Sequence, residues 1–452
     1  MSALDQKVRQ GYKQSEVGII PDEWDVLLMD EVTDSLSSGA TPFRGNSSFY
    51  KGSNRWITSG ELKYGVINNT IEKISDEAIK KANLKVHPSG TFLMAITGLE
   101  AAGTRGSCGI VGKPSTTNQS CMAVYPNKKL TSNYLFHWYV YNGDELAFKY
   151  CQGTKQLSYT AGLLKTIPVL VPRDTTEQTA IANALSDVDA LLTELEKLIA
   201  KKQAIKTATM QQLLTGKTRL PQFATYTEGE KKGQPKGTKP SELGEIPEDW
   251  DVLLMDEVTD SLSSGATPFR GNPSFYKGNN RWITSGELKY GVINDTIEKI
   301  SDEAIKKANL KVHQPGTFLM AITGLEAAGT RGSCGIVGTP ATTNQSCMAI
   351  YPNKKLKSSY LFHWYVYNGE ELALKYCQGT KQLSYTAGLL KTIPVLVPRN
   401  ADEQTAISSI PSDMNNEIQT IEQRLAKTRQ IKQGMMQELL TGRTRLPFEK
   451  ES

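Results

Sequence analysis

Short apolar runs alternate with polar, glycine-containing turns over the first third of the chain. Four of these runs are rich in branched and aromatic residues and are bounded by turns, which predicts buried strands. They lie at 91–97, 108–111, 121–125 and 167–171. Two stretches, 134–141 and 145–151, have helical spacing instead. The pattern predicts a mixed α/β (α+β) domain of about 150 residues.

A much longer periodic stretch follows at 175–214. Its apolar positions recur at alternating intervals of four and three residues, which is the seam of a coiled coil. They are Ile181, Leu185, Val188, Leu192, Leu195 and Ile199. Asp174 and Glu177 have the spacing of a capping box, and Gly216 supplies the stop signal. Forty helical residues would form a rod of about 60 Å.

A second stretch of this kind begins at Asn400. Its seam consists of Ile407, Met414, Ile418, Ile421 and Leu425. Pro411 replaces the counterpart of Leu185, which predicts a kinked helix or a late start. A helix with one apolar stripe must bury it. We expect the two helices to pack antiparallel against each other; the alternative is that each packs only on its own domain. Four lysines of the first helix are expected on its polar outer face: Lys197, Lys201, Lys202 and Lys206.

The chain contains an internal repeat with an offset of 226 residues. Residues 21–173 and 247–399 differ at only 14 of 153 aligned positions. The helical stretches that follow share few residues, but similarity returns at 213–221 and 439–447. The order of parts is therefore cyclic: globular unit, helix, link, globular unit, helix. The predicted domains are 1–173 (first globular unit with the N-terminal segment), 174–220 (first helix), 221–246 (linker), 247–399 (second globular unit) and 400–447 (second helix).

Composition narrows the class of protein. The chain has 452 residues and a net charge of +5, which is compatible with binding a polyanion. It shows no apolar run of membrane-spanning length and no signal peptide, so we expect a cytoplasmic protein. The six cysteines lack the spacing of a zinc site and are expected to be buried thiols, with no bound metal.

No catalytic motif is found. Gly216-Lys-Thr resembles the end of a P-loop, but Gln211 stands where the first glycine is required, and Arg443 replaces the lysine in the second copy. Nucleophile-elbow, zinc-protease, dinucleotide-binding and amino-methyltransferase motifs are also missing. We therefore expect a non-catalytic chain without a cofactor of its own.

The loops of each globular unit carry residues suited to DNA. Arginine and lysine suit guanine edges, asparagine and glutamine suit adenine edges, and hydroxyls suit phosphates. The candidate DNA contacts are Thr41, Arg44, Lys63, Tyr64, Thr104, Arg105, Asn118, Gln119, Lys155, Gln156, Ser158 and Tyr159, with their copies Thr267, Arg270, Lys289, Tyr290, Thr330, Arg331, Asn344, Gln345, Lys381, Gln382, Ser384 and Tyr385. For any single loop, an ordinary surface turn is the alternative.

Three stretches carry a family resemblance. Gly39-Ala-Thr-Pro, with Arg55-Trp-Ile-Thr-Ser-Gly-Glu-Leu, resembles the opening of target-recognition domains in specificity subunits of type I restriction–modification enzymes. Leu164-Lys-Thr-Ile-Pro-Val-Leu-Val-Pro resembles their junction into a conserved helix, and Met210-Gln-Gln-Leu-Leu-Thr-Gly-Lys-Thr-Arg-Leu-Pro resembles its end. All three stretches recur in the second copy, so the resemblance spans nearly the whole chain.

The resemblance implies a non-catalytic DNA-recognition subunit. Each target-recognition domain would read one half of a gapped site, and the helices would fix the gap. Its implied partners are double-stranded DNA, two modification subunits that methylate adenine with S-adenosylmethionine, and two restriction subunits that use ATP and Mg²⁺. In the family the two domains normally differ. Here the candidate loops are identical, and antiparallel helices would relate them by a pseudo-two-fold axis, which predicts a gapped palindrome. A stand-alone DNA-binding regulator, an orphan specificity protein and a protein-binding repeat scaffold stay open.

Overall fold

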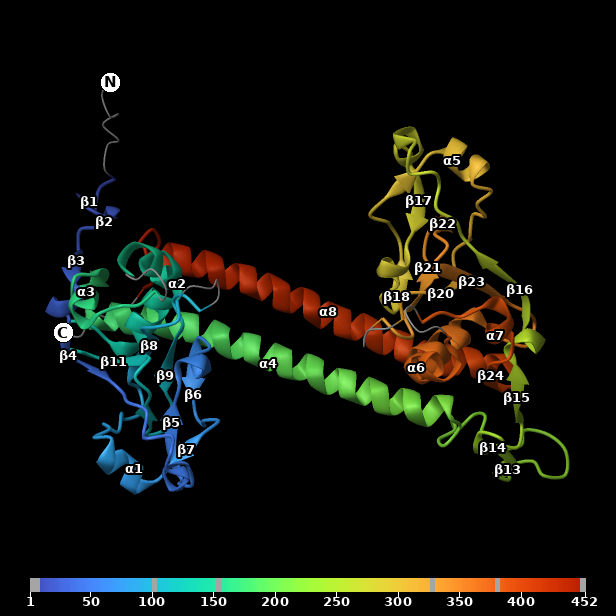
Figure 1. The fold of residues 1–452 in the computed structure, drawn as a ribbon, viewed down its shortest axis with the longest axis horizontal. Coiled ribbons are helices and arrows are strands. Elements are labelled where there is room, and N and C mark those ends of the chain that lie inside the picture. Colours follow the sequence, from blue (N-terminus) through green and yellow to red (C-terminus); the bar gives the residue numbers. More distant parts are fainter. Residues whose placement is uncertain (1–8, 100–103, 152–156, 326–329, 379–382, 448–452) are drawn as a thin grey trace. The chain divides into compact units, whose positions relative to one another are not determined.

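The computed structural model describes residues 9–99, 104–151, 157–325, 330–378 and 383–447 (Figure 1). The chain forms two compact units. The first consists of Met1–Glu196 with Gln423–Ser452, and the second of Lys197–Glu422. Each unit therefore contains one copy of the repeat, the beginning of one long helix and the end of the other, so neither helix belongs to a single unit.

A five-stranded sheet forms the centre of the first unit. Its strands, in spatial order, are β4 (Thr33–Ser38), β11 (Cys121–Pro126), β8 (Phe92–Ala95), β9 (Cys108–Val111) and β6 (Gly65–Ile67). Neighbouring strands are antiparallel except for β6 and β9. The structure confirms the strands predicted at 91–97, 108–111 and 121–125, which correspond to β8, β9 and β11. All four residues of β8 are buried. The predicted run at 167–171 corresponds to β12 (Pro168–Pro172), which pairs with β3 (Trp24–Leu28).

One helix, α2 (Ser132–Tyr150), packs on this sheet, where the sequence predicts two. The ring of Tyr139 meets that of Phe92 edge to face, with 5.7 Å between the ring centroids. The helix continues through Gly143, where the backbone of Gly106 packs against it. The short helix α3 (Ala161–Lys165) leads into β12.

A smaller three-stranded sheet lies at the end of the unit remote from the long helices (Figure 1). It consists of β10 (Thr116–Thr117), β5 (Asn54–Ile57) and β7 (Lys73–Ile74), with helix α1 (Asp76–Lys81) beside it. It has its own apolar core, formed by Phe49, Trp56, Ile74, Ala78 and Leu84.

The second unit repeats this arrangement element by element. Its elements are β13 (Thr238–Ser241), β14 (Gly244–Pro247), β15 (Trp250–Leu254), β16 (Thr259–Ser264), β17 (Asn280–Ile283), β18 (Gly291–Ile293), β19 (Lys299–Ile300), α5 (Asp302–Lys307), β20 (Phe318–Ala321), β21 (Cys334–Val337), β22 (Ala341–Thr343), β23 (Cys347–Pro352), α6 (Ser358–Tyr376), α7 (Ala387–Lys391) and β24 (Pro394–Pro398). The strand order of its five-stranded sheet, β16-β23-β20-β21-β18, matches that of the first unit.

A hairpin precedes each recognition unit, and the sequence analysis missed both. The first pairs β1 (Tyr12–Ser15) with β2 (Gly18–Pro21), and the second pairs β13 with β14. The second hairpin lies partly in the segment expected to be an irregular linker. The repeated Lys-x-Ser-Glu-x-Gly pattern, with glycine at a positive φ of 113° in Gly18 and 94° in Gly244, was the available signal.

The first long helix, α4, spans Thr175–Leu214 and confirms the predicted range. Asp174 caps it by accepting a hydrogen bond from the Thr176 N–H at 2.8 Å. The Glu177 carboxylate binds Trp24 and Arg445, and the expected capping box stays a prediction.

The second long helix, α8, spans Ala401–Leu439 and includes Pro411. The expected late start is therefore wrong. Its first turn is held by the Asn400 side chain, which accepts from the Asp402 N–H at 2.7 Å. Gln404 adds bonds to the backbone of Lys355 and Pro398, so tertiary contacts fix the helix before the proline is reached.

The predicted seam residues are buried or half-buried in both helices. In the first unit, Ile181 and Leu185 of α4 belong to one core with Met436 and Leu439 of α8 and with the recognition unit itself. In the second unit, Met210 of α4 and Ile407 of α8 share a core in the same way. Both expected packing modes therefore occur together within each unit, and the coiled-coil geometry of the seam stays a prediction.

Ion pairs within each unit show that the two helices run antiparallel. In the first unit, Lys432 contacts Asp189 at 2.5 Å and Arg429 contacts Glu196 at 2.6 Å. In the second, Lys202 contacts Glu417 at 2.5 Å. Lys206 donates to the amide oxygen of Asn415 at 2.6 Å and is half-buried. The expectation that Lys202 and Lys206 lie on the outer face is thus wrong, because both reach the partner helix.

A cluster of charged side chains around one buried glutamate, which we call the helix-end clasp, fastens the globular domain of each unit to the segment that follows the long helix from the other copy. In the second unit, Arg219 donates to both oxygens of Glu403 at 2.7 and 2.8 Å, and also to Asp249. The Glu403 side chain is 1 % exposed and also accepts from the indole N–H of Trp250. The first unit repeats the clasp with Arg445, Glu177, Glu23 and Trp24.

Candidate nucleic-acid interface

The loop Thr104–Ser107 is held on helix α2 by a contact between two glycines. A Cβ on Gly106 would lie 2.8 Å from the carbonyl carbon of Gly143, and a Cβ on Gly143 would lie 2.8 Å from the Cα of Gly106. Gly106 also has a positive φ of 69°. Because only glycine allows this approach, the loop is fixed with Arg105 directly beside the second half of α2.

Tyr64 fixes the same loop from the other side. Its hydroxyl donates to the carbonyl oxygen of Arg105 at 3.1 Å, and its backbone has an unusual positive φ of 58°. Lys63, the preceding residue, is exposed. The structure therefore brings together Lys63, Tyr64, Thr104 and Arg105, which the sequence placed in two separate loops.

The side chain of Arg105 lies along α2. Its Nε donates to Asp144 at 2.8 Å, and its guanidinium lies 4.1 Å from the ring centroid of Phe148. In the second unit, Nη2 of Arg331 reaches Glu370 at 3.5 Å, and Leu374 replaces the phenylalanine. The sequence analysis did not identify residues 144 and 148, or their counterparts 370 and 374, as partners of the arginine. Both positions are among the 14 that differ between the copies.

A cavity of about 270 Å³ adjoins this loop in the second unit. It is lined by Lys289, Tyr290 and Thr330, together with the turn that begins at Ser285 and the backbone of Gly324. Burial raises the pKa of Tyr290 above its usual value, and the Glu370 carboxylate adds to that shift. Hydroxyl, ammonium and backbone groups thus converge on one hollow of the recognition unit.

Thr41 and Gln119, predicted from separate loops, also meet. The Thr41 hydroxyl donates to the amide oxygen of Gln119. A Cβ on Gly39 would overlap the carbonyl of Thr117, so glycine is required for the two loops to lie this close. Asn118 is more constrained, because its amide oxygen accepts from the backbone N–H of Ser120 at 3.1 Å. The pair Thr41–Gln119 is exposed, and the second unit repeats it in Thr267–Gln345.

Arg44 is already engaged within its domain. It forms a two-pronged pair with Glu72 at 2.6 and 2.9 Å and stacks on Tyr50, 4.3 Å from the ring centroid. The Glu72 carboxylate raises the pKa of Arg44, and the guanidinium lowers that of Glu72. Arg270 and Glu298 repeat the pair. A contact between Arg44 and DNA would have to open this pair or use the remaining edge of the guanidinium.

Two candidates belong to the core instead of the surface. Tyr159 is 4 % exposed and Tyr385 is 3 % exposed, and each packs into the main apolar core of its unit. We therefore withdraw both as DNA contacts. Ser158 and Ser384 pair with Thr97 and Thr323 in isolated bridges. The remaining candidates, Lys155, Gln156, Lys381 and Gln382, lie outside the described residues. DNA contact by the other candidates stays a prediction.

The buried titratable groups are structural. Cys108 and Cys121 are buried, as are their copies, and burial raises the pKa of these thiols far above the usual range. Burial, with Lys432 nearby, lowers the pKa of His137 to about 4. Over the described ranges, no group of three His, Cys, Asp or Glu side chains is arranged to hold a metal ion.

The comparisons with known proteins agree on one family. Residues 21–207 and 247–430 match the family model of the type I restriction modification DNA specificity domain. The chain belongs to this family. It is a specificity subunit of a type I restriction–modification system, and the two globular units are its DNA-recognition domains.

Relatives of this specificity subunit are distant in sequence. The specificity subunit of the MjaIX type I restriction enzyme of Methanocaldococcus jannaschii is 23 % identical over 319 residues, which are 69 % of each chain. A putative MjaX specificity subunit of that organism is 27 % identical over 269 residues, 57 % of this chain and 58 % of the relative.

Two solved structures have the same fold. The S subunit of a type I restriction–modification system from M. genitalium superposes with a TM-score of 0.59 at 13 % identity, covering 100 % of this chain and 99 % of that one. A chain from a study of complex assembly and conformational transition of a type I system gives 0.51 at 15 % identity, covering 94 % and 99 %. Within the described part of this specificity subunit, every helix is too short or too polar to cross a membrane.

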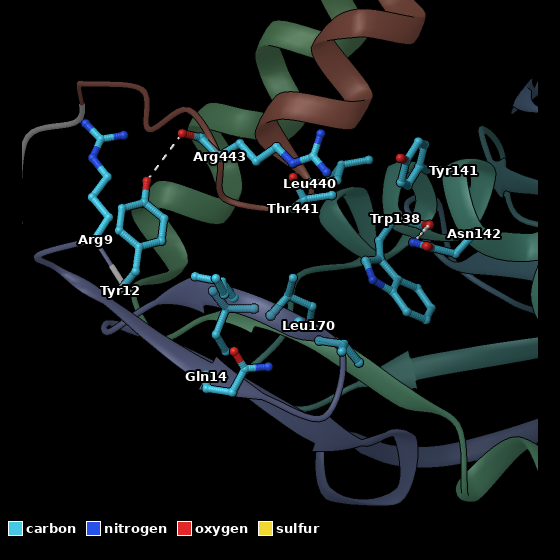
Figure 2. Close-up of a pocket in the computed structure, with 14 residues that line it drawn as sticks. Arg9, Tyr12, Gln14, Trp138, Tyr141, Asn142, Leu170, Leu440, Thr441 and Arg443 are labelled. Carbon is cyan, nitrogen blue, oxygen red and sulfur yellow. Dashed lines mark hydrogen bonds between the residues drawn. The ribbon is translucent and has the colours of Figure 1, made fainter. Parts of the chain in front are cut away.

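A groove away from the predicted DNA loops recurs in both units of the specificity subunit. In the first unit it has a volume of about 900 Å³ and lies between the first hairpin, α2 and the end of α8 (Figure 2). Tyr12 closes one wall by donating to the Arg443 carbonyl at 3.3 Å, and Trp138 and Tyr141 form the opposite wall. The corresponding groove of the second unit, about 460 Å³, contains Trp364.

Proposed function

We propose that each recognition domain of this specificity subunit reads one half of a gapped DNA site, and that the two halves are the same sequence in inverted orientation. One observation carries the proposal: the described loops around Tyr64–Arg105 and Thr41–Gln119 recur with the same residues in the second domain, and the two hydrogen bonds that join them, from Tyr64 to the Arg105 carbonyl and from Thr41 to Gln119, recur as well. Equivalent surfaces read equivalent bases, and antiparallel helices invert the second copy.

The long helices would set the gap and provide the scaffold for other subunits. Helix α4 contains 40 residues, which corresponds to about 60 Å at 1.5 Å per residue. That length exceeds one helical turn of B-DNA, about 34 Å, so the two half-sites would be separated by non-contacted base pairs. Ion pairs join α4 to α8 inside each unit.

The proposed partners are double-stranded DNA, two modification subunits and two restriction subunits. The modification subunits would bind S-adenosylmethionine and methylate adenine at N6, and the restriction subunits would use ATP and Mg²⁺ for translocation and cleavage. The specificity subunit would contribute sequence recognition and bind none of these cofactors. The division of labour follows from the family, and the internal repeat of the chain supports two copies of each partner.

Long-read methylation profiling tests this function. The chain is expressed with its modification subunit, and methylated adenines are mapped. Methylation in a gapped inverted repeat supports the proposal. Methylation at an asymmetric gapped site would keep the family function but refute the argument from identical loops. If an active modification subunit leaves DNA unmethylated, a stand-alone DNA-binding regulator becomes the better explanation.

Substitution of Arg105 tests which loop reads bases. If the side chain contacts a base edge, Arg105→Ala relaxes the sequence requirement in one half-site only, with a loss of about 1–3 kcal/mol in binding. Arg331→Ala would have the same effect through the other domain. Uniform weakening on all DNA sequences would instead assign these arginines to phosphates, and the slope of log affinity against log salt concentration would fall by about 1.

A further inference from the structure

The two recognition domains of this chain provide a comparison within one molecule. Their described loops are the same, but the surroundings of the loop arginine differ. Residue 144 is aspartate in the first domain and its counterpart, residue 370, is glutamate; residue 148 is phenylalanine and its counterpart, residue 374, is leucine. These positions are one turn apart on α2 and α6, so they form one face of the helix.

The first domain holds its arginine from two sides. Asp144 accepts from Nε of Arg105 at 2.8 Å, the length of a strong charge-assisted hydrogen bond. The Phe148 ring lies under the guanidinium, 4.1 Å from its centroid, which is close enough for a cation–π contact. Together these contacts fix both the direction and the plane of the guanidinium.

The second domain holds its arginine differently. Glu370 engages Nη2 of Arg331 in place of Nε, and at 3.5 Å, the outer limit of a hydrogen bond. Leu374 has no aromatic face on which a guanidinium can stack. A carboxylate on Nη2 also covers a different edge of the planar group, so the edge presented to a ligand changes with the partner atom.

The backbone of the two loops offers no compensating difference. Gly332 meets Gly369 as Gly106 meets Gly143, with the same 2.8 Å approach of the added Cβ. The Tyr290 hydroxyl donates to the Arg331 carbonyl at 3.1 Å, as Tyr64 does to that of Arg105. The loop is therefore placed identically in both domains, and residues 144, 148, 370 and 374 change only how the arginine side chain is held.

We propose that these two pairs of residues set how strictly each domain reads the base that its loop arginine contacts, so that the two halves of one palindromic site are read with unequal stringency. The inference rests on the proposed function. A guanidinium fixed in advance loses little freedom on binding and tolerates little displacement, so a wrong base is strongly disfavoured. The first domain is the strict reader, and the second tolerates a mismatch. Asp144, Phe148, Glu370 and Leu374 are positioning residues that act through the arginine.

Exchanging the residues between the domains tests the proposal. E370D/L374F gives two strict domains, and D144E/F148L gives two tolerant domains. The matched control, N133S, makes the same kind of exchange at an exposed position at the start of α2. Each full-length chain is combined with its modification subunit. Methylation rates are then measured on duplexes with no mismatch, one mismatched half-site or two mismatched half-sites.

The wild-type complex and N133S should methylate the singly mismatched duplex much faster than the doubly mismatched one. E370D/L374F should lower the rate on the singly mismatched duplex by about three- to tenfold, and D144E/F148L should raise the rate on the doubly mismatched duplex by a similar factor. Urea midpoints should change little, and the change in rate on the mismatched duplexes should exceed the change on the perfect duplex, which separates a positioning role from a general loss of stability or of DNA binding.

Equal mismatch profiles for all four chains would overturn the unequal-stringency proposal while leaving the proposed function intact. Absence of sequence-specific methylation by the wild-type complex would overturn both. The single variants add a further check: if Phe148→Leu alone reproduces the whole effect, the ring holds the arginine, and if Asp144→Glu alone does so, the carboxylate holds it. A null result for both, with an effect only in the double variant, supports the combined clamp.

Discussion

Removing Arg219 measures how strongly the helix-end clasp fastens the second recognition domain. The Arg219 side chain is 11 % exposed, and its partner Glu403 is 1 % exposed. Arg219→Met keeps the aliphatic bulk and removes the charge. Glu403 then keeps the indole N–H of Trp250 but loses its cation. Breaking a buried ion pair from one side costs about 3–5 kcal/mol, because a charge is left in a poorly solvated site.

The double variant R219M/E403M shows whether the loss arises from that stranded charge. Burial already raises the pKa of Glu403 despite the neighbouring guanidinium, which means that the site is costly for a carboxylate. Replacing both partners by apolar side chains of similar volume is often near neutral. We therefore expect R219M/E403M to be more stable than R219M alone, with the remaining cost due to Asp249 and to the unpartnered indole.

Arg399→Met is the matched control. Arg399 also forms a two-pronged pair, with Asp251, at 2.7 Å on both prongs, but its side chain is 59 % exposed. Exposed ion pairs contribute about 0–1 kcal/mol, so R399M should change stability by less than that. Urea unfolding followed by circular dichroism measures all three variants. Equal destabilisation by R219M and R399M would refute the argument that burial decides the strength of the clasp.

Three further predictions follow from buried or strained positions. Burial and Lys432 lower the pKa of His137 to about 4, so between that pKa and pH 6.5 the unfolded chain binds more protons at this histidine than the folded chain does. His137 should therefore reduce the free energy of unfolding by about 2 kcal/mol when the pH falls from 7.5 to 5. In urea titrations at the two pH values, His137→Gln should show a smaller loss of stability by that amount. Gly143→Ala should displace the loop it supports, costing about 1–3 kcal/mol and sequence specificity in urea titrations and methylation assays. Gly162→Ala, whose Cβ would make only an ordinary contact with the Thr160 hydroxyl at 3.9 Å, should be neutral or slightly stabilising in the same assays. Pro411→Ala should raise the unfolding free energy by about 1–3 kcal/mol in urea titrations, because it restores a helix hydrogen bond; an unchanged midpoint would show that α8 already compensates for the proline.

The sequence was sufficient wherever a periodic pattern decided the structure. The range of α4, three strands of the main sheet and the near-identity of the two domains could all be predicted, because burial requires the apolar positions that were read. The sequence was insufficient where the local structure depends on a contact with a residue far away in the chain. Glu177 has capping-box spacing but binds Arg445, a residue 268 positions away. The sequence predicts two helices, 134–141 and 145–151, where α2 continues through Gly143 with the backbone of Gly106 packed against it.

The candidate site follows the same division. Residue type correctly suggested surface loops at Lys63 and Gln119, both exposed, because polar side chains in glycine-rich turns rarely lie in a core. Tyr159 was misplaced because a tyrosine in such a turn has the same sequence signature whether its ring points outward or into the core. The partners of Arg105 could not be identified in advance, since nothing in a linear pattern shows that Phe148, 43 residues later, lies under its guanidinium.

The divergence of the two helices has a physical reason that the recognition domains lack. Arg429–Glu196 is an exposed ion pair between α4 and α8, and Lys202–Glu417 is a partly exposed one; neither has an equivalent at the position related by the repeat. The corresponding residues are Thr428, Leu191, Gln203 and Glu422. Two copies of α4 in the same antiparallel register would therefore lose both pairs. At about 0.2–1 kcal/mol for each exposed pair, this favours α4 with α8 by a factor of about two to thirty. So small a preference is sufficient to pair α4 with α8, because both helices belong to one chain and therefore have a high effective concentration for each other. Identical helices would forgo this preference, whereas identical recognition domains lose nothing when their target is a palindrome.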